Sequence, residues 1–129
     1  MNFKLMDAYF SNIVEKTQSN NNFRQVLYTG TYMQLVVMSL LPGEEIGMEV
    51  HAAVDQFFRV EEGIANVIVD GKEQIVVDDM VFIVPAGAQH NVINTGTTSL
   101  KLYTIYSPPN HPQGTIHATK ADAAVAEHA

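Results

Sequence analysis

Apolar side chains along this chain recur in short, strand-sized runs separated by turn-forming residues. Runs of about four to eight residues rich in β-branched and aromatic side chains, bounded by Gly, Pro, Asn and Asp, are typical of β-strands. The pattern predicts strands at residues 23–28, 34–41, 56–60, 64–69, 74–77, 80–84, 90–94 and 100–106. Asp70-Gly71 is the strongest hairpin signal, because this dipeptide suits the positive φ angles of a type I′ turn. Since helical periodicity is almost absent before residue 118, we expect an all-β sandwich or barrel.

The two ends of the chain have weaker patterns. Residues 1–20 fit a short helix or an edge strand, and we expect an arm that packs on the barrel or on a second subunit. Its candidate anchors are apolar: Phe3, Leu5, Met6, Tyr9, Phe10, Ile13 and Val14. A polar tail at 110–119 leads into an Ala-rich segment at 120–129, which fits a short helix or a frayed end. We therefore expect one domain over residues 1–129, with its barrel core at 23–107.

Composition excludes several classes of function. The chain has 129 residues, of which 47% are hydrophobic and 16% charged, as is ordinary for a globular protein. A net charge of -7, with 7 bases scattered singly, provides no basic surface for nucleic acid or a membrane. We find neither a membrane-spanning run nor a signal peptide. The absence of cysteine fits a reducing compartment, so we expect a cytoplasmic protein.

Nitrogen and oxygen donors that suit a metal ion occur in two places. Glu49 and His51 are two residues apart, so an extended strand directs both side chains to the same face. His90 arrives on a second strand, after a Pro-Ala-Gly turn. Two imidazoles and one carboxylate are the donor set of open, facial-triad iron sites, and Gln56 can add a carbonyl oxygen. Because closed structural zinc sites usually include Cys, we expect an open metal site.

Each of these residues also has a simpler explanation. Two distant histidines are more often ordinary polar residues than ligands, Glu49 can lie on a solvated strand face, and Gln56 can belong to a turn. Asp55 can support a metal ligand by a hydrogen bond or act as a general base. We expect His111 and His117, in the polar tail, at the surface or at a subunit contact.

The spacing of the donors resembles the two motifs of the cupin superfamily. In the first motif a Gly precedes His-x-His, then Glu, then Gly; this chain has Gly43, Glu49-Val50-His51, Gln56 and Gly63 at the matching intervals. In the second, Gly, Pro-x-Gly, His and Asn correspond to Asp79, Pro85, Gly87, His90 and Asn94. The match covers residues 43–94. It departs from the family where Glu49 replaces the first His, Gln56 replaces the Glu and Asp79 replaces a Gly.

The resemblance implies a double-stranded β-helix, or jelly-roll barrel, with one divalent metal near its mouth. Its ligands would be Glu49, His51, Gln56 and His90, and the metal Mn, Fe, Co, Ni or Zn. Glu49 restores the negative charge that Gln56 lacks, so the ligand charge of the family is kept. Some cupins that process sugar acids in pectin breakdown have Gln at this position, although their first ligand is usually His. Cupins of this size often pair, so a homodimer is expected.

Two functions remain open at this stage. In the first, the protein is an enzyme of isomerase or dioxygenase type acting on a small polar molecule, such as a sugar, a sugar acid or an enolisable carbonyl compound. Glu49 and Asp55 are its candidate catalytic groups. In the second, the barrel binds or senses a small molecule without turning it over, and its metal is structural or vestigial. An open donor set inside an apolar barrel favours the enzyme, while the fold alone does not determine the reaction.

Overall fold

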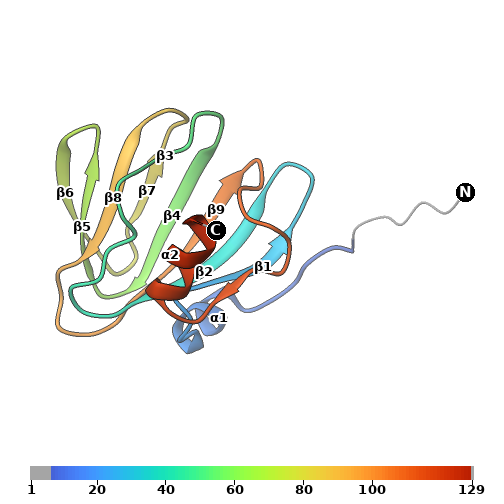
Figure 1. Cartoon of the computed structure of the whole chain (residues 1–129). Coiled ribbons are helices and arrows are strands. Elements are labelled where there is room, and N and C mark those ends of the chain that lie inside the picture. The colour runs from blue at the N-terminus through green and yellow to red at the C-terminus, as the bar shows by residue number, and fades with distance from the viewer. Residues whose placement is uncertain (1–6, 129) are drawn as a thin grey trace, which may run out of the picture.

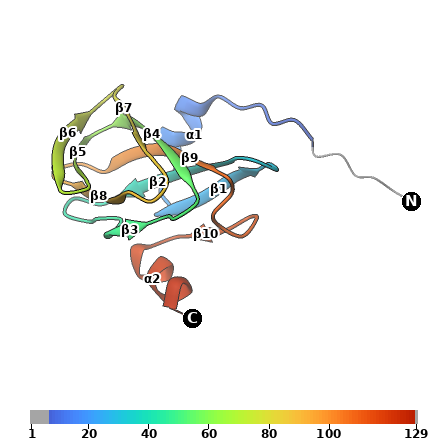
Figure 2. The ribbon, with the colours of Figure 1, turned by 90° about the horizontal axis from the view of Figure 1, so that it is seen from above.

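A computed structural model describes residues 7–128 and shows two β-sheets that face each other. The sheets form two layers in Figure 2, with the N-terminal helix outside one layer and the C-terminal helix on the opposite side of the molecule. The anchors expected at Phe3, Leu5 and Met6 lie outside the described residues. The all-β class predicted from the strand pattern is confirmed.

Every strand pairs antiparallel to its neighbours within the two sheets. The larger sheet has the order β10-β1-β2-β9-β4-β7, and the smaller one β3-β8-β5-β6. The strands of the larger sheet are β1 (Arg24–Thr29), β2 (Gln34–Leu40), β4 (Asp55–Glu62), β7 (Val81–Val84), β9 (Leu100–Ser107) and β10 (Ile116–His117). Those of the smaller sheet are β3 (Glu49–Val50), β5 (Ile64–Val69), β6 (Lys72–Val77) and β8 (Gln89–Asn94).

The predicted strands all occur, with bounds that shift by one or two residues. Asp70 and Gly71 have φ angles of 48° and 81°, as the predicted turn between β5 and β6 requires. Asp79 has a φ of 70°, so this Asp adopts the left-handed conformation of the Gly it replaces in the motif. The pattern missed β10, because a two-residue strand in a polar segment has no hydrophobic alternation to reveal it.

Both terminal segments contain helices. The first, α1 (Ile13–Ser19), begins at Asn12, whose side chain accepts a hydrogen bond from the backbone N–H of Glu15 and caps the helix. The second, α2 (Lys120–His128), confirms the helical alternative for the Ala-rich segment. Ahead of α1, Tyr9 packs on Tyr28 with ring centroids 5.6 Å apart, so this end of the chain contacts β1.

The space between the sheets is apolar at one end and polar at the other. Residues paired across β2, β9 and β4 show the change, since Met38, Leu102 and Val60 form one inward row. Four residues further along, the corresponding row is Gln34, Tyr106 and Gln56. In the facing sheet the row Ala65–Asn94 gives way to Val67–Val92 and then to Val69–His90. Tyr106 contacts His51, which contacts His90, so the polar rows of the two sheets lie at the same end of the sandwich. Asn94 and Arg24 are buried polar residues of the apolar rows.

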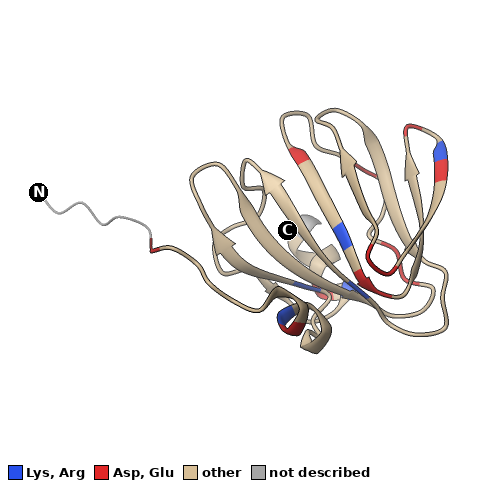
Figure 3. Ribbon diagram, turned by 180° about the vertical axis from the view of Figure 1, so that it is seen from behind, with Lys and Arg blue, Asp and Glu red and all other residues tan. Residues whose placement is uncertain are grey.

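The outer surface carries scattered charges and exposed apolar side chains. Lys and Arg occur singly in Figure 3, and Arg59 pairs with Glu61 and Asp79 on the outer face. Exposed apolar side chains occur on β6 and β7, an edge strand of each sheet, at Ile75, Val77, Val81 and Ile83. The homodimer stays a prediction. Within residues 7–128, none of the helices has the length and apolar character needed to cross a bilayer.

Candidate metal centre

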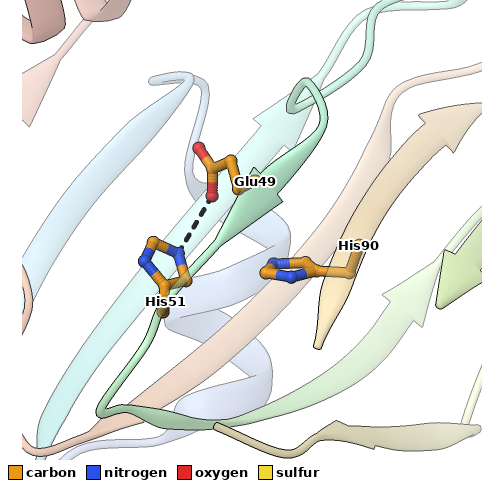
Figure 4. Close-up of side chains that lie close together, drawn as sticks. All are labelled: Glu49, His51 and His90. Carbon is orange, nitrogen blue, oxygen red and sulfur yellow. Dashed lines mark hydrogen bonds and ion pairs between the residues drawn. The ribbon is translucent and has the colours of Figure 1, made fainter. Parts of the chain in front are cut away.

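Three of the four predicted ligands meet at the polar end of the sandwich. Glu49 and His90 are direct partners in the pairing of β3 with β8, so both side chains point inward between the sheets. His51 follows β3 and its carbonyl accepts a hydrogen bond from the N–H of Gly87, which ties the two motifs together. One donor atom from each side chain lies within 4.8 Å of the other two. Figure 4 shows the imidazole of His90 directed toward the Glu49–His51 pair.

The spacing inside this cluster suits a metal ion. His51 Nε2 and Glu49 Oε2 are 3.1 Å apart. Two adjacent ligands at right angles, each about 2.1 Å from a metal, are separated by roughly 3 Å. The same distance is an ordinary N–H···O hydrogen bond when the proton of His51 is on Nε2. Glu49 and His51 can therefore either coordinate the same metal ion or form a hydrogen bond with each other.

His90 is held in the form that binds metals. Its Nδ1 lies 3.4 Å from the carbonyl oxygen of Ala88, which assigns the proton to Nδ1 and leaves a lone pair on Nε2. Nε2 is buried and has no hydrogen-bond partner among the described residues. Burial lowers the pKa of His90 below its ordinary value, against the opposing effects of the Ala88 carbonyl and Glu49. A neutral imidazole with a buried, unused lone pair is a typical metal ligand.

Gln56 offers a second unused acceptor. Thr104 donates its hydroxyl proton to the carbonyl of Phe57 at 2.8 Å, so its oxygen accepts from Gln56 Nε2 at 3.0 Å. That bond fixes the amide orientation and leaves Gln56 Oε1 buried without a partner among the described residues. An unsatisfied buried carbonyl costs about 1–3 kcal/mol, which a ligand or metal ion at this oxygen would offset.

Glu49 is ionised in this setting. Burial raises the pKa of Glu49, but the hydrogen bond from His51 and the charges of His51, Arg24 and His90 together lower it below its ordinary value. A carboxylate, two imidazoles and an amide oxygen fit a divalent transition metal and leave room for further ligands. The residues present therefore fit the metal that the sequence motifs imply, and the identity of the metal is open.

Asp55 lies outside the cluster. It is exposed at the start of β4, where its carboxylate accepts a hydrogen bond at 2.9 Å from the N–H of Ala86 in the turn before β8. Because side chains alternate along a strand, Gln56 points inward and Asp55 does not. Asp55 thus holds the turn that leads to His90, and its role as a general base stays a prediction.

Three further polar residues make contacts that sequence reasoning did not predict. His111, expected at the surface or at a subunit contact, is half-buried, and its Nε2 lies 3.2 Å from the phenol oxygen of Tyr106. His117, expected at the surface or at a subunit contact, is partly exposed and pairs with Arg24 across β10 and β1, with Nδ1 3.3 Å from Arg24 Nη1. Arg24 itself is 1% exposed. No local motif marks these residues, because the tail that carries both histidines packs on β1 and β2 only in the tertiary structure.

Comparison with known proteins identifies the family. The model of the cupin domain matches residues 36–106, which include both motifs and all four predicted ligands. The chain belongs to the cupin family. The predicted double-stranded β-helix is thereby confirmed.

Relatives of this cupin include proteins of closely similar sequence. The uncharacterized protein YrkC of Bacillus subtilis (strain 168) is 53% identical over 90% of this chain and 66% of its own length. The chain thus spans slightly less than two thirds of YrkC. The crystal structure of BH2720 from Bacillus halodurans has a TM-score of 0.91 and 45% identity, covering 92% of this cupin and 95% of that chain. KdgF from Halomonas sp. has a TM-score of 0.63 and 20% identity over 67% of this chain and 78% of its own, which shows a shared fold.

Proposed function

We propose that this cupin is a metal-dependent enzyme of isomerase or oxygenase type that acts on a small polar molecule. The observation that carries the proposal is His90 Nε2, an acceptor that is buried and unused among the described residues and belongs to the cluster with Glu49 and His51. Gln56 Oε1, on the same inward row as Tyr106, is a second such acceptor. Proteins seldom leave such atoms unsatisfied except at ligand, metal or catalytic sites. The remaining coordination positions of an ion held by these four residues would be open to substrate.

A bound divalent metal would supply Lewis-acid polarisation of a carbonyl oxygen or a site for oxygen. The residues of the chain would hold this metal and shape its surroundings. Glu49 contributes the negative charge, and the two imidazoles bind as neutral donors. Phe58 lies against His90 with ring centroids 6.1 Å apart, and Tyr106 lies against His51 at 5.9 Å. Each of the two imidazoles therefore contacts an aromatic ring. These rings exclude water and strengthen electrostatic interactions at the centre.

A second function is a barrel that binds a small molecule without catalysis. The 3.1 Å contact between His51 and Glu49 favours it, since these two side chains satisfy each other without an ion. In that case the cluster would be a charged hydrogen-bonded pair, and ligand binding would not depend on metal. Metal dependence is therefore the property that separates the two functions.

The deciding experiment is elemental analysis of the untagged protein as purified, after chelation, and after reloading with Mn, Fe, Co, Ni and Zn ions. The proposal expects one transition metal per chain, with oxygen uptake or isomerisation of sugars and enolisable carbonyl compounds only in the loaded protein. His90→Asn should lose both metal and turnover while remaining folded by circular dichroism. A wild-type protein that takes up no metal would overturn the proposal in favour of the binding barrel.

A further inference from the structure

The outer face of the larger sheet is apolar. A solvated face of an antiparallel sheet usually carries polar side chains. Here one outward row crosses five strands in register and consists of Tyr28, Leu35, Ile105, Phe57 and Ile83. Leu35, Phe57 and Ile105 each lie between two buried residues of their strands, so side-chain alternation directs them outward. Ile83 is 63% exposed and the other four side chains are half-buried, so the row is only partly covered.

A second outward row lies beside the first and contains a single charge. It is paired across β7, β4, β9 and β2 and consists of Val81, Arg59, Tyr103 and Val37. The rings of Tyr103 and Phe57 contact each other with centroids 6.2 Å apart, which joins the two rows. Arg59 forms ion pairs with Glu61 and Asp79 of its own chain, so its charge is already balanced. Figure 3, which shows the molecule from the side of α1, has few charged residues along these strands.

Helix α1 covers one end of this outer face. It packs on β2, β9 and β4 and buries Thr17. The chain just after the helix is held by Lys101 of β9, whose ammonium group donates hydrogen bonds to the carbonyl of Asn20 and to Oδ1 of Asn21. Lys101 and Ile105 are four residues apart on the same strand, which places the apolar row about 13 Å beyond this anchor. The helix therefore leaves the row partly exposed.

The segment before α1 extends the apolar surface beyond the sheet. Tyr9 packs on Tyr28, the β1 end of the row, with ring centroids 5.6 Å apart. The next residue, Phe10, is 90% exposed. Figures 1 and 2 both show this segment leaving the body of the molecule. An exposed aromatic side chain on a segment that leaves its own chain is available to a second molecule.

The charge and shape of the face fit a second copy of the chain. Each chain carries a net charge of -7, but the apolar rows with a balanced Arg59 can meet their own copy without repulsion between like charges. Two sheet faces pack well against each other at about 10 Å. The two rows cover roughly 20 by 13 Å, judged from strand and residue spacings. A typical stable interface buries about 800 Å² on each partner, so the apolar segment before α1 has to supply further area.

We propose that the outer face of the larger sheet, together with the segment before α1, binds a second copy of the chain about a two-fold axis. The row from Tyr28 to Ile83 packs against the same row of the second copy, and the segment at Phe10 extends onto that copy. Two-fold dimers are the commonest symmetric assemblies, and their interfaces are self-complementary, as this face is. The assignment goes beyond the proposed function and does not depend on the metal.

The test is sedimentation equilibrium of the full chain over a range of concentrations, which measures the dissociation constant of the dimer. The wild-type chain should sediment as a dimer. Ile105→Glu should raise the dissociation constant by about a hundredfold or more, because the two-fold axis buries two unpaired carboxylates in one interface. Ile83→Glu, at the exposed end of the row, should raise it by about tenfold. Because Ile83 is already exposed in the single chain, this variant tests the face even if Ile105→Glu does not fold by circular dichroism.

Two matched controls separate the proposed interface from the rest of the surface. Ile75→Glu makes the same change at a side chain that is 53% exposed on β6, an edge strand of the smaller sheet, and should leave the dissociation constant unchanged. Phe10→Ser should raise the constant by about tenfold, as expected for the loss of an aromatic contact. Val125→Ser, at an exposed apolar residue of α2, should leave it unchanged.

The outcomes distinguish the parts of the proposal. A wild-type chain that stays monomeric at every concentration would overturn the second copy as the occupant of this face. A dimer as stable in Ile105→Glu and Ile83→Glu as in Ile75→Glu would overturn the face as the interface. Weaker dimers in the two face variants, with Phe10→Ser equal to Val125→Ser, would support the face and overturn the part assigned to the segment before α1.

Discussion

Glu49 and His90 lie directly opposite each other in the antiparallel pairing of β3 with β8. Directly opposed residues in such a pair have Cα atoms about 4.5–5.5 Å apart, so the two side chains leave the sheet side by side. β3 contains only Glu49 and Val50, and its register on β8 therefore determines whether the carboxylate meets the imidazole. A slip of one residue would direct Glu49 away from the site.

Removing an imidazole should remove the metal and keep the fold. We expect His51→Ala and His90→Ala each to lose stoichiometric metal after chelation and reloading, because each takes one nitrogen donor from the cluster. Metal content by elemental analysis and far-UV circular dichroism are the measurements. His111→Gln is the control, since His111 contacts Tyr106 and not the cluster, and it should retain the metal. Unchanged stoichiometry in either Ala variant would contradict the ligand assignment.

Glu49 and Gln56 should differ in their effect on metal affinity. Glu49→Ala removes a charge and a donor, whereas Gln56→Ala removes a neutral oxygen. We expect affinity to fall by about a hundredfold for Glu49→Ala and by about tenfold for Gln56→Ala. Competition with a chromophoric chelator measures both values. Equal losses in the two variants would show that Glu49 does not carry the charge of the site.

Gly63 should tolerate no larger residue. Its φ is +116°, and an added Cβ would lie 3.1 Å from the Cα of Leu100 and 3.3 Å from the carbonyl oxygen of Ser99, both backbone atoms. Gly63→Ala should lower the free energy of unfolding by about 2–4 kcal/mol. Gly43→Ala is the control with φ +84° and no atom within 4 Å, and it should cost about 1 kcal/mol. Urea denaturation tests the order, and a larger loss at Gly43 would contradict it.

His111 should make stability depend on pH between about 4 and 6.5. Its folded pKa of about 4 lies below that of the unfolded chain, so acid protonates the unfolded state first. The lowered pKa of His111 therefore contributes to the free energy of unfolding above pH 6.5, and this contribution, up to about 3 kcal/mol, is lost as the pH falls toward 4. In the metal-free protein, the free energy of unfolding of His111→Gln should therefore fall less than that of the wild type over this range. Parallel curves would contradict the buried, neutral state of His111.

The sequence by itself determined the strand class and most of the candidate centre. Strand-sized apolar runs between turn residues predicted the sheets, because side-chain alternation and turn chemistry are local properties. The two motifs predicted Glu49, His51 and His90 as ligands of one metal ion, and the structure places their donor atoms within 4.8 Å of one another. Asp79 was noted as a departure from the family, and its φ of 70° shows that an Asp can keep the turn of a Gly.

Only the tertiary structure decided which other residues surround the centre. Arg24 and the tail histidines carry no local signal, since their positions depend on β10 pairing with β1 and on Gln34 holding the loop at His111. The structure also shows that Gln56 points into the barrel and Asp55 does not, because neighbouring residues of a strand face opposite sides of the sheet. Local patterns determine elements and their faces, whereas contacts between segments distant in sequence determine which polar groups are buried together. In this cupin those long-range contacts place the ring of Tyr106 against His51, and that of His111 against Tyr106.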